Sequence, residues 1–214
     1  VFAIWGLMAR REMFSGNDDF DSLTGKESSY YFNNVLMLVA TIVVSYLTVS
    51  SALPAFMPGG GKSFGPDTYD AVAHPVGILY VLIMAVCPLL SWGKTEGPTF
   101  WKRAKWPLVG TGALGAALLA VWYTQLLPIA QKVGSSNSFE PLNVQTLYAV
   151  IGLLTAAFAI SVSVFMFTEG ARRKAMAKDE SFGAALWHII TRARTQSGGY
   201  LTHLGVGIIL IGLI

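Results

Sequence analysis

The sequence predicts an all-α fold: a polytopic transmembrane helical bundle with four full spans and two partial ones. Hydrophobic residues make up 53% of the 214 residues and charged residues only 13%, whereas soluble domains carry about 25% charged residues. Uncharged apolar runs recur along the chain and reach the roughly 18 residues typical of a membrane span. These observations exclude a disordered chain, a secreted disulfide scaffold and an ordinary soluble enzyme.

Four apolar segments have the length of a membrane span and contain no Asp, Glu, Lys, Arg or His. They are Asn33–Leu53, Pro75–Trp92, Pro107–Leu127 and Val144–Phe167. We expect each to be a helix, because the bilayer core offers no partner to unpaired backbone groups. Pro75 and Pro107 are expected in the first turn, where the missing N–H costs nothing. Pro88, near the end of the second span, is expected to kink it.

The two ends of the chain are also apolar, but they are shorter than the four spans. Val1–Leu7 and Leu201–Ile214 fall below the roughly 20 helical residues that cross a bilayer. We therefore expect two partial spans. Residues 1–214 are predicted to form one transmembrane domain belonging to a longer protein.

The positive charges are distributed unequally between alternate connections. Thirteen lie in the first, third and fifth connections: Arg10, Arg11, Lys26, Lys94, Lys102, Arg103, Lys105, Arg172, Arg173, Lys174, Lys178, Arg192 and Arg194. The other two connections hold only Lys62 and Lys132. Because positive loops stay on the cytoplasmic side, this asymmetry predicts cytoplasmic basic connections. The single Cys87 excludes an internal disulfide and a Cys-x-x-Cys site.

The long fifth connection contains an amphipathic pattern. Its apolar residues are Phe182, Ala185, Leu186, Ile189 and Ile190, the spacing of one helix face. Asp179 or Ser181 can cap the start, and basic side chains at the end suit the helix dipole. We predict an amphipathic helix over 179–195, lying in the cytoplasmic membrane interface. Just before it, Glu169 is expected to form a local ion pair with Arg172 or Arg173.

Two of the three histidines have ordinary structural interpretations. His188 lies on the amphipathic helix, off its apolar stripe, and is expected to be solvated or at headgroup level. His74 precedes Pro75 and is expected at the outer start of a span. The alternative for His74 is a contact with a molecule that docks on the outer face.

His203 is the candidate site residue, because it lies within the last apolar segment. An ionisable group inside a span is a functional hypothesis by default, and a neutral imidazole is a good iron ligand. Gly198, Gly199, Gly205 and Gly207 flank it and leave room for a flat molecule or a neighbouring helix. A histidine bonded to a facing helix is the competing structural interpretation.

Several ordered motifs resemble a known family. They are Glu27 with Asn33-Asn34 before a span, Gly65-Pro66 through Tyr69-Asp70 to Pro75, the run Met84–Trp92 containing Pro88-Leu89-Leu90, and Arg192–Gly207 with Gly-Gly-Tyr-x-x-His. Together they resemble the C-terminal portion of the cytochrome c-type biogenesis haem lyases (CcmF/NrfE). Cys87 stands where that family usually has glycine, and the Gly59–Gly61 loop is unusual for it.

The resemblance implies a function in cytochrome c maturation. Members of the family are inner-membrane proteins that accept haem from a haem chaperone and attach it to apocytochrome c. They also hold a b-type haem between two histidines, with quinol proposed as the electron source. By this resemblance His203 is an axial ligand of the haem b iron, and its partner histidine lies outside this chain. The outer loop Pro54–His74 is expected to contact the partner that carries or receives haem.

The resemblance also implies limits and leaves alternatives. The tryptophan-rich segment that handles substrate haem in the family is absent from these residues, so the chain is not expected to catalyse alone and no catalytic residue is assigned. A cofactor-free transporter or channel fragment would also explain the spans and the charge asymmetry. A structural subunit of a membrane complex is the third possibility.

Overall fold

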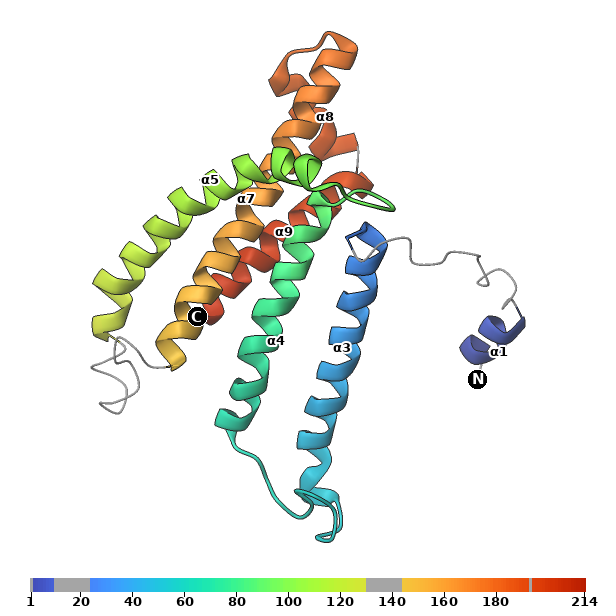
Figure 1. The fold of residues 1–214 in the computed structure, drawn as a ribbon, viewed down its shortest axis with the longest axis vertical. Helices are drawn as coiled ribbons and strands as arrows, with labels where there is room; N and C mark the ends of the chain where they lie inside the picture. The colour runs from blue at the N-terminus through green and yellow to red at the C-terminus, as the bar shows by residue number, and fades with distance from the viewer. Residues whose placement is uncertain (1, 10–23, 130–143, 193) are drawn as a thin grey trace.

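The computed structural model describes residues 2–9, 24–129, 144–192 and 194–214. These residues are almost entirely helical and contain no strand (Figure 1). The α-helices are α1 (Phe2–Ala9), α3 (Lys26–Val49), α4 (Pro66–Val86), α5 (Gly97–Val121), α7 (Val144–Lys178), α8 (Phe182–Arg192) and α9 (Arg194–Leu213). Four helical stretches are long and apolar enough to cross a membrane. The predicted all-α bundle with four spans is therefore confirmed.

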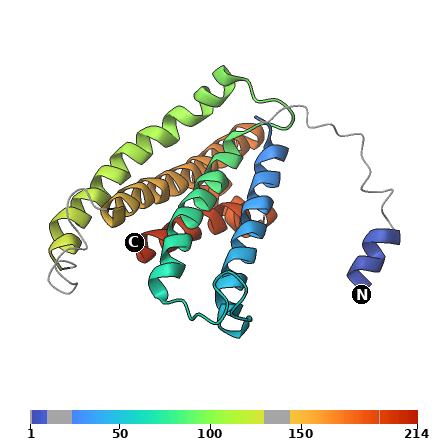
Figure 2. The ribbon, with the colours of Figure 1, turned by 60° about the horizontal axis from the view of Figure 1, so that its bottom comes forward.

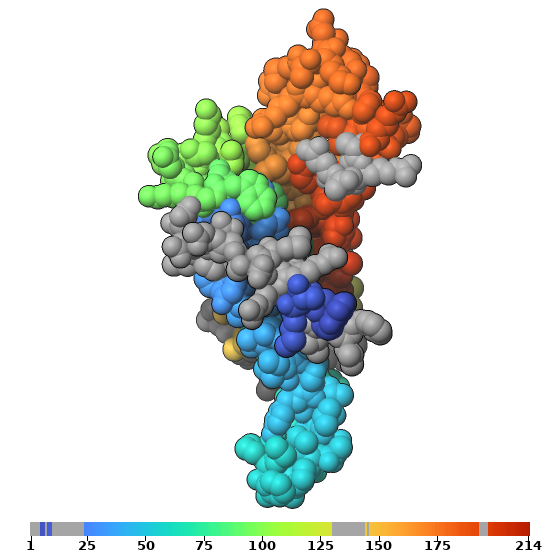
Figure 3. Space-filling model, turned by 90° about the vertical axis from the view of Figure 1, so that its right-hand side faces the viewer, coloured from blue at the N-terminus to red at the C-terminus, as the bar shows by residue number. Residues whose placement is uncertain are grey.

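Helix α7 forms the centre of the bundle. It packs against α4, α5, α8 and α9, whereas α3 packs mainly against α4 (Figures 1 and 2). Figure 3 shows the α3–α4 connection projecting at one end of the molecule and the α7–α8 hairpin at the other. The last helix, α9, lies alongside α7 and completes its buried surface.

Small residues make the central packing possible. Ala156 and Ala159 of α7 are buried with Val81 and Ala85 of α4 and with Leu210 of α9. A Cβ placed at Gly207 of α9 would lie 2.8 Å from Cγ1 of Ile160 on α7. Close backbone approach of this kind is how helices associate where lipid removes the hydrophobic driving force.

The basic connections gather at one end of the bundle. The N–H of Lys26, at the start of α3, donates to the carbonyl of Ser91 beyond α4 over 3.0 Å. The Glu27 carboxylate accepts the Gly93 N–H at 3.0 and 3.1 Å. This end also carries the start of α5 and the α7–α8 hairpin, and the α3–α4 connection, which contains Lys62, lies at the opposite end (Figure 1). The predicted segregation of charge therefore holds for the described residues.

The predicted positions of Pro75 and Pro107 are wrong. Helix α4 begins at Pro66 and α5 at Gly97, so both prolines lie inside helices. The helices extend past their apolar segments, because water can solvate the added polar turns. The first turns of these helices contain Pro66 and Pro98 instead, in agreement with the preference of proline for the first helical turn.

Pro88 ends a helix instead of kinking it. Helix α4 stops at Val86, and Pro88 lies in a 3₁₀ turn over Cys87–Leu89. Arg103 of α5 donates from Nη1 to the Ser91 Oγ at 3.1 Å. The α4–α5 connection is thus held by a side chain from the helix that follows it.

The predicted amphipathic helix is present and shorter than expected, with α8 covering Phe182–Arg192. Helix α7 ends in a tight reversal: Asp179 has φ +51°, and the Glu180 N–H donates to the Ala175 carbonyl at 3.1 Å. The Ser181 Oγ accepts the Ala184 N–H at 3.4 Å, which confirms one of the two predicted caps. The buried side of α8 faces α7 and α9.

Candidate functional site

His203 lies on the side of α9 that faces the bundle. It is half-buried and shares its helix face with the buried residues Gly207 and Leu210. The Tyr200 ring packs edge-on against Phe167 of α7, with centroids 5.1 Å apart. Since Gly207 contacts Ile160, His203 lies at a level of α7 between Ile160 and Phe167.

One hydrogen bond places a proton on Nδ1 of the His203 ring. Its Nδ1 lies 2.7 Å from the carbonyl oxygen of Gly199, one turn earlier in α9. A carbonyl oxygen only accepts hydrogen bonds, so Nδ1 carries a proton, and in the neutral form of this ring Nε2 carries the lone pair. Nε2 has no hydrogen-bond partner among the described residues. This arrangement, a backbone carbonyl orienting the ring, is the usual one behind a metal-ligating imidazole.

The glycines around His203 divide into two groups. Gly198, Gly199 and Gly205 have no atom within 4 Å of the position that a Cβ would occupy. Gly207 meets Ile160 and the Ala156 carbonyl, so it serves helix packing. The helix-packing interpretation is therefore confirmed for Gly207, and room for a flat molecule beside the other three glycines stays a prediction.

The structure does not bring the three histidines together. The His74 ring stacks on Tyr148 near the start of α7, with centroids 5.8 Å apart. Tyr148 and Ile160 are separated by about 18 Å of helix. The His188 Nδ1 accepts a hydrogen bond from the Lys174 ammonium. Lys174 follows Phe167 along α7 and is therefore farther from Ile160 than Phe167 is. Hence His203 has no histidine partner in this chain, and no group of three potential metal ligands occurs in the described part.

Two expectations about these residues need correction. His74 is the ninth residue of α4, so it lies within the helix and not at its start. His188 is half-buried and joins α8 to α7 through Lys174, so it is not simply solvated. The predicted ion pair of Glu169 is present, and its partner is Arg173 at 2.9 Å.

The loop between α3 and α4 is shorter than the predicted segment Pro54–His74, because Pro66–His74 belongs to α4. The Ser50 Oγ donates to the Lys62 carbonyl at 2.8 Å, and the Gly61 N–H donates to the Ser50 carbonyl at 2.9 Å. Gly61, with φ +71°, has the backbone conformation that this turn requires. The loop tip presents Phe56, which is 87% exposed. The loop is thus an ordered turn with an aromatic tip.

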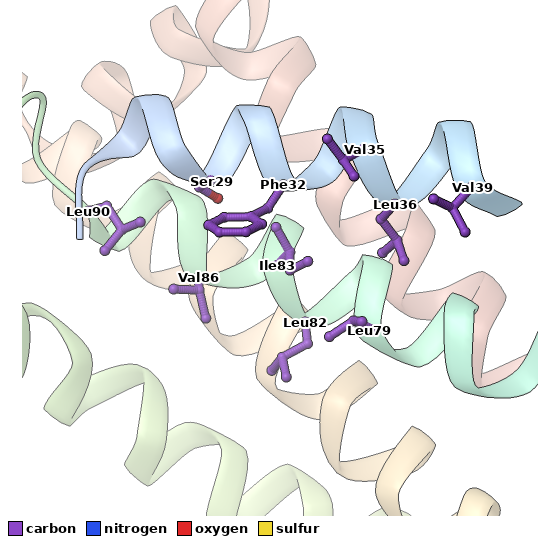
Figure 4. Close-up of a pocket in the computed structure, with 10 residues that line it drawn as sticks. All are labelled: Ser29, Phe32, Val35, Leu36, Val39, Leu79, Leu82, Ile83, Val86 and Leu90. Carbon is purple, nitrogen blue, oxygen red and sulfur yellow. The ribbon is translucent and has the colours of Figure 1, made fainter. Parts of the chain in front are cut away.

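Sequence reasoning missed an apolar groove between α3 and α4, of about 590 Å³. Its polar lining is limited to Ser29, and Phe32 and Leu36 of α3 lie toward Leu79 and Ile83 of α4 (Figure 4). At the same level, the Oδ1 of Asn33 is buried without a hydrogen-bond partner. No periodic signal in the sequence marks this groove, because both helices are apolar on nearly every side.

No protein-family model, curated protein or solved structure matches this chain. The evidence for a function therefore lies in the residues of the chain itself and in the geometry of His203.

Proposed function

We propose that this chain is part of a membrane haem lyase that attaches haem to apocytochrome c, and that His203 is an axial ligand of a b-type haem. The observation that carries the proposal is the orientation of the His203 ring: Nδ1–H is held by Gly199, and Nε2 has no hydrogen-bond partner among the described residues. An imidazole in that state is ready to bind iron. The motif resemblance around Gly198–Gly207 supports the same assignment.

The residues present fit half of such a site. His203 offers one nitrogen ligand, and the uncrowded backbone at Gly199 and Gly205 permits a flat molecule to approach. The second axial histidine comes from another segment, since His74 and His188 are engaged elsewhere. When bound, the haem supplies one-electron redox chemistry that keeps substrate haem iron reduced, with quinol as the electron source. The contribution of this chain is to orient the half-buried His203 and to leave one side of it accessible to the haem.

The orientation of the bundle follows from its charge. We place the protein in the plasma (inner) membrane with its basic end in the cytoplasm. The loop around Phe56 then faces apocytochrome c and the haem chaperone. A cysteine at Ser63 should be labelled from outside by an impermeant reagent, and one at Thr95 only after permeabilisation. The reverse pattern would overturn this orientation. Crosslinking from Ser63 that captures neither partner would instead count against the contact of the loop with them.

The decisive experiment compares His203→Ala with His188→Ala in the complex purified with its partners. Absorption spectra of the reduced and oxidised protein should show a b-type signal in the wild type and in His188→Ala. His203→Ala should lose most of it while keeping its helical content, because α9 is held by its packing on α7. Wild-type haem content in His203→Ala would make His203 a structural histidine.

The axial role is separated from a packing role by His203→Cys. A thiolate still binds iron but changes its reduction potential, so this variant should retain part of the haem with a shifted spectrum. The transporter or channel fragment and the structural subunit predict no haem in the wild-type complex. A wild-type complex without haem would therefore refute the proposal directly.

A further inference from the structure

A second pocket lies at the basic end of the bundle, apart from His203. It has a volume of about 620 Å³ and is formed by α5, α7 and the first residue of α8. Trp106 comes from α5, Phe165, Glu169 and Arg172 come from α7, and Phe182 comes from α8. Its lining therefore combines aromatic surface with charged groups, unlike the apolar groove between α3 and α4.

The pocket lies where the apolar part of the bundle meets its charged part. On α5, Trp106 directly precedes the apolar run that begins at Pro107. On the neighbouring α7, the apolar run ends at Phe167, and Glu169 follows. The two helices pack side by side, with Gly110 against Ser161, so these transitions fall at one level. Tryptophan is enriched at this level of membrane proteins.

The charges of the pocket favour an anion. Its single carboxylate, Glu169, is paired with Arg173 at 2.9 Å. Arg172 lines the pocket and has no ion pair among the described residues. The Lys105 ammonium lies 5.6 Å from the Trp106 ring centroid and adds positive charge at the rim. A guanidinium is well suited to two phosphate oxygens at once.

We propose that this pocket binds an anionic phospholipid, with the phosphate at Arg172 and an acyl chain along Trp106 and Phe165. A free phosphate would use Arg172 alone, whereas the pocket also offers aromatic surface at the membrane interface. The inference is independent of the haem proposal, because it uses none of the residues around His203. It requires only that the basic end of the bundle contact a membrane surface.

The test uses the full chain in bilayers of phosphatidylcholine that contain a small fraction of phosphatidylglycerol. Bromine atoms on the phosphatidylglycerol acyl chains should quench the fluorescence of Trp106, obtained as the difference between wild type and Trp106→Phe. The same bromine fraction on phosphatidylcholine should quench it less. Equal quenching by the two brominated lipids would overturn the proposal.

Matched arginine variants assign the effect to the pocket. Arg172→Gln should lower the preference for phosphatidylglycerol about fivefold, because the guanidinium that holds the phosphate in the pocket is lost. Arg192→Gln removes the same charge from the far end of α8 and should leave the preference unchanged. Equal losses in both variants would indicate general surface charge and refute a specific pocket. Abolition of the preference by inorganic phosphate would reassign the site to a soluble anion.

Discussion

Helices α7 and α3 are both strongly apolar, yet they are buried to very different extents. Half of the most apolar 18-residue window of α7 is buried inside the protein, compared with 6% of that of α3. The difference follows from side-chain size: α7 presents Ala156, Ala157 and Ala159 to its neighbours, whereas α3 presents large aliphatic and aromatic residues to its surroundings. Apolarity therefore indicates a membrane environment, and small residues indicate where helices pack.

The largest expected effect comes from shortening one leucine on each helix. Leu153 of α7 is 3% exposed and packs with Trp122 and Ala149, whereas Leu38 of α3 is 61% exposed. Leu153→Ala should lower the free energy of unfolding by about 2–5 kcal/mol, because it leaves a cavity. Leu38→Ala should change it by no more than about 0.5 kcal/mol. Unfolding in mixed micelles, followed by circular dichroism, measures both, and equal losses would contradict the comparison.

A smaller effect is expected from enlarging a side chain at the contact between α7 and α9. Ala156 is fully buried, and its carbonyl lies 3.3 Å from the position of a Cβ on Gly207. Ala156→Leu should destabilise the bundle by about 1–3 kcal/mol through overpacking. Ala117→Leu, on the exposed side of α5, is the matched control and should be close to neutral. The same unfolding assay applies. An unchanged free energy of unfolding in Ala156→Leu would show that the contact between α7 and α9 can accept a larger side chain.

The smallest effect concerns the polar attachment of α3. The Glu27 carboxylate accepts the Gly93 N–H, and Glu27→Ala should cost about 1 kcal/mol. The Gly93 amide should then exchange its hydrogen faster, which mass spectrometry of the peptide around Gly93 can follow. Glu96→Ala is the control, because Glu96 makes no side-chain cap at the start of α5. Unchanged exchange in Glu27→Ala would mean that α3 is held by its apolar contacts alone.

The sequence predicted the parts of the fold that depend on local pattern. The four spans, the amphipathic helix and its Ser181 cap follow from apolar periodicity and capping chemistry, and all are observed. The acceptor for Nδ1 of His203 is likewise a local feature, because a carbonyl four residues earlier is always within reach in a helix. Local rules therefore account for the orientation of the candidate ligand.

Features that depend on tertiary contact were not predictable from the sequence. Apolar composition does not say where a helix begins, so the helical segments 66–74 and 97–106, which place Pro75 and Pro107 within helices, were missed. The contact between Gly25 and Gly93 joins residues far apart in the chain: a Cβ at Gly25 would lie 2.1 Å from the Gly93 carbonyl oxygen. The sequence predicted a solvated or headgroup-level His188, and the contact with Lys174 was missed because that residue lies on another helix.

The uninterrupted length of α7 has a consequence for the choice of membrane. Its apolar segment, residues 144–167, measures about 36 Å, while a typical hydrocarbon core is about 30 Å thick. A helix longer than the core tilts or thickens the surrounding bilayer, each at a modest energetic cost. Lipids with longer acyl chains would match α7 with less tilt. Acyl-chain length, and not headgroup charge alone, should therefore influence the stability of this bundle in a given membrane.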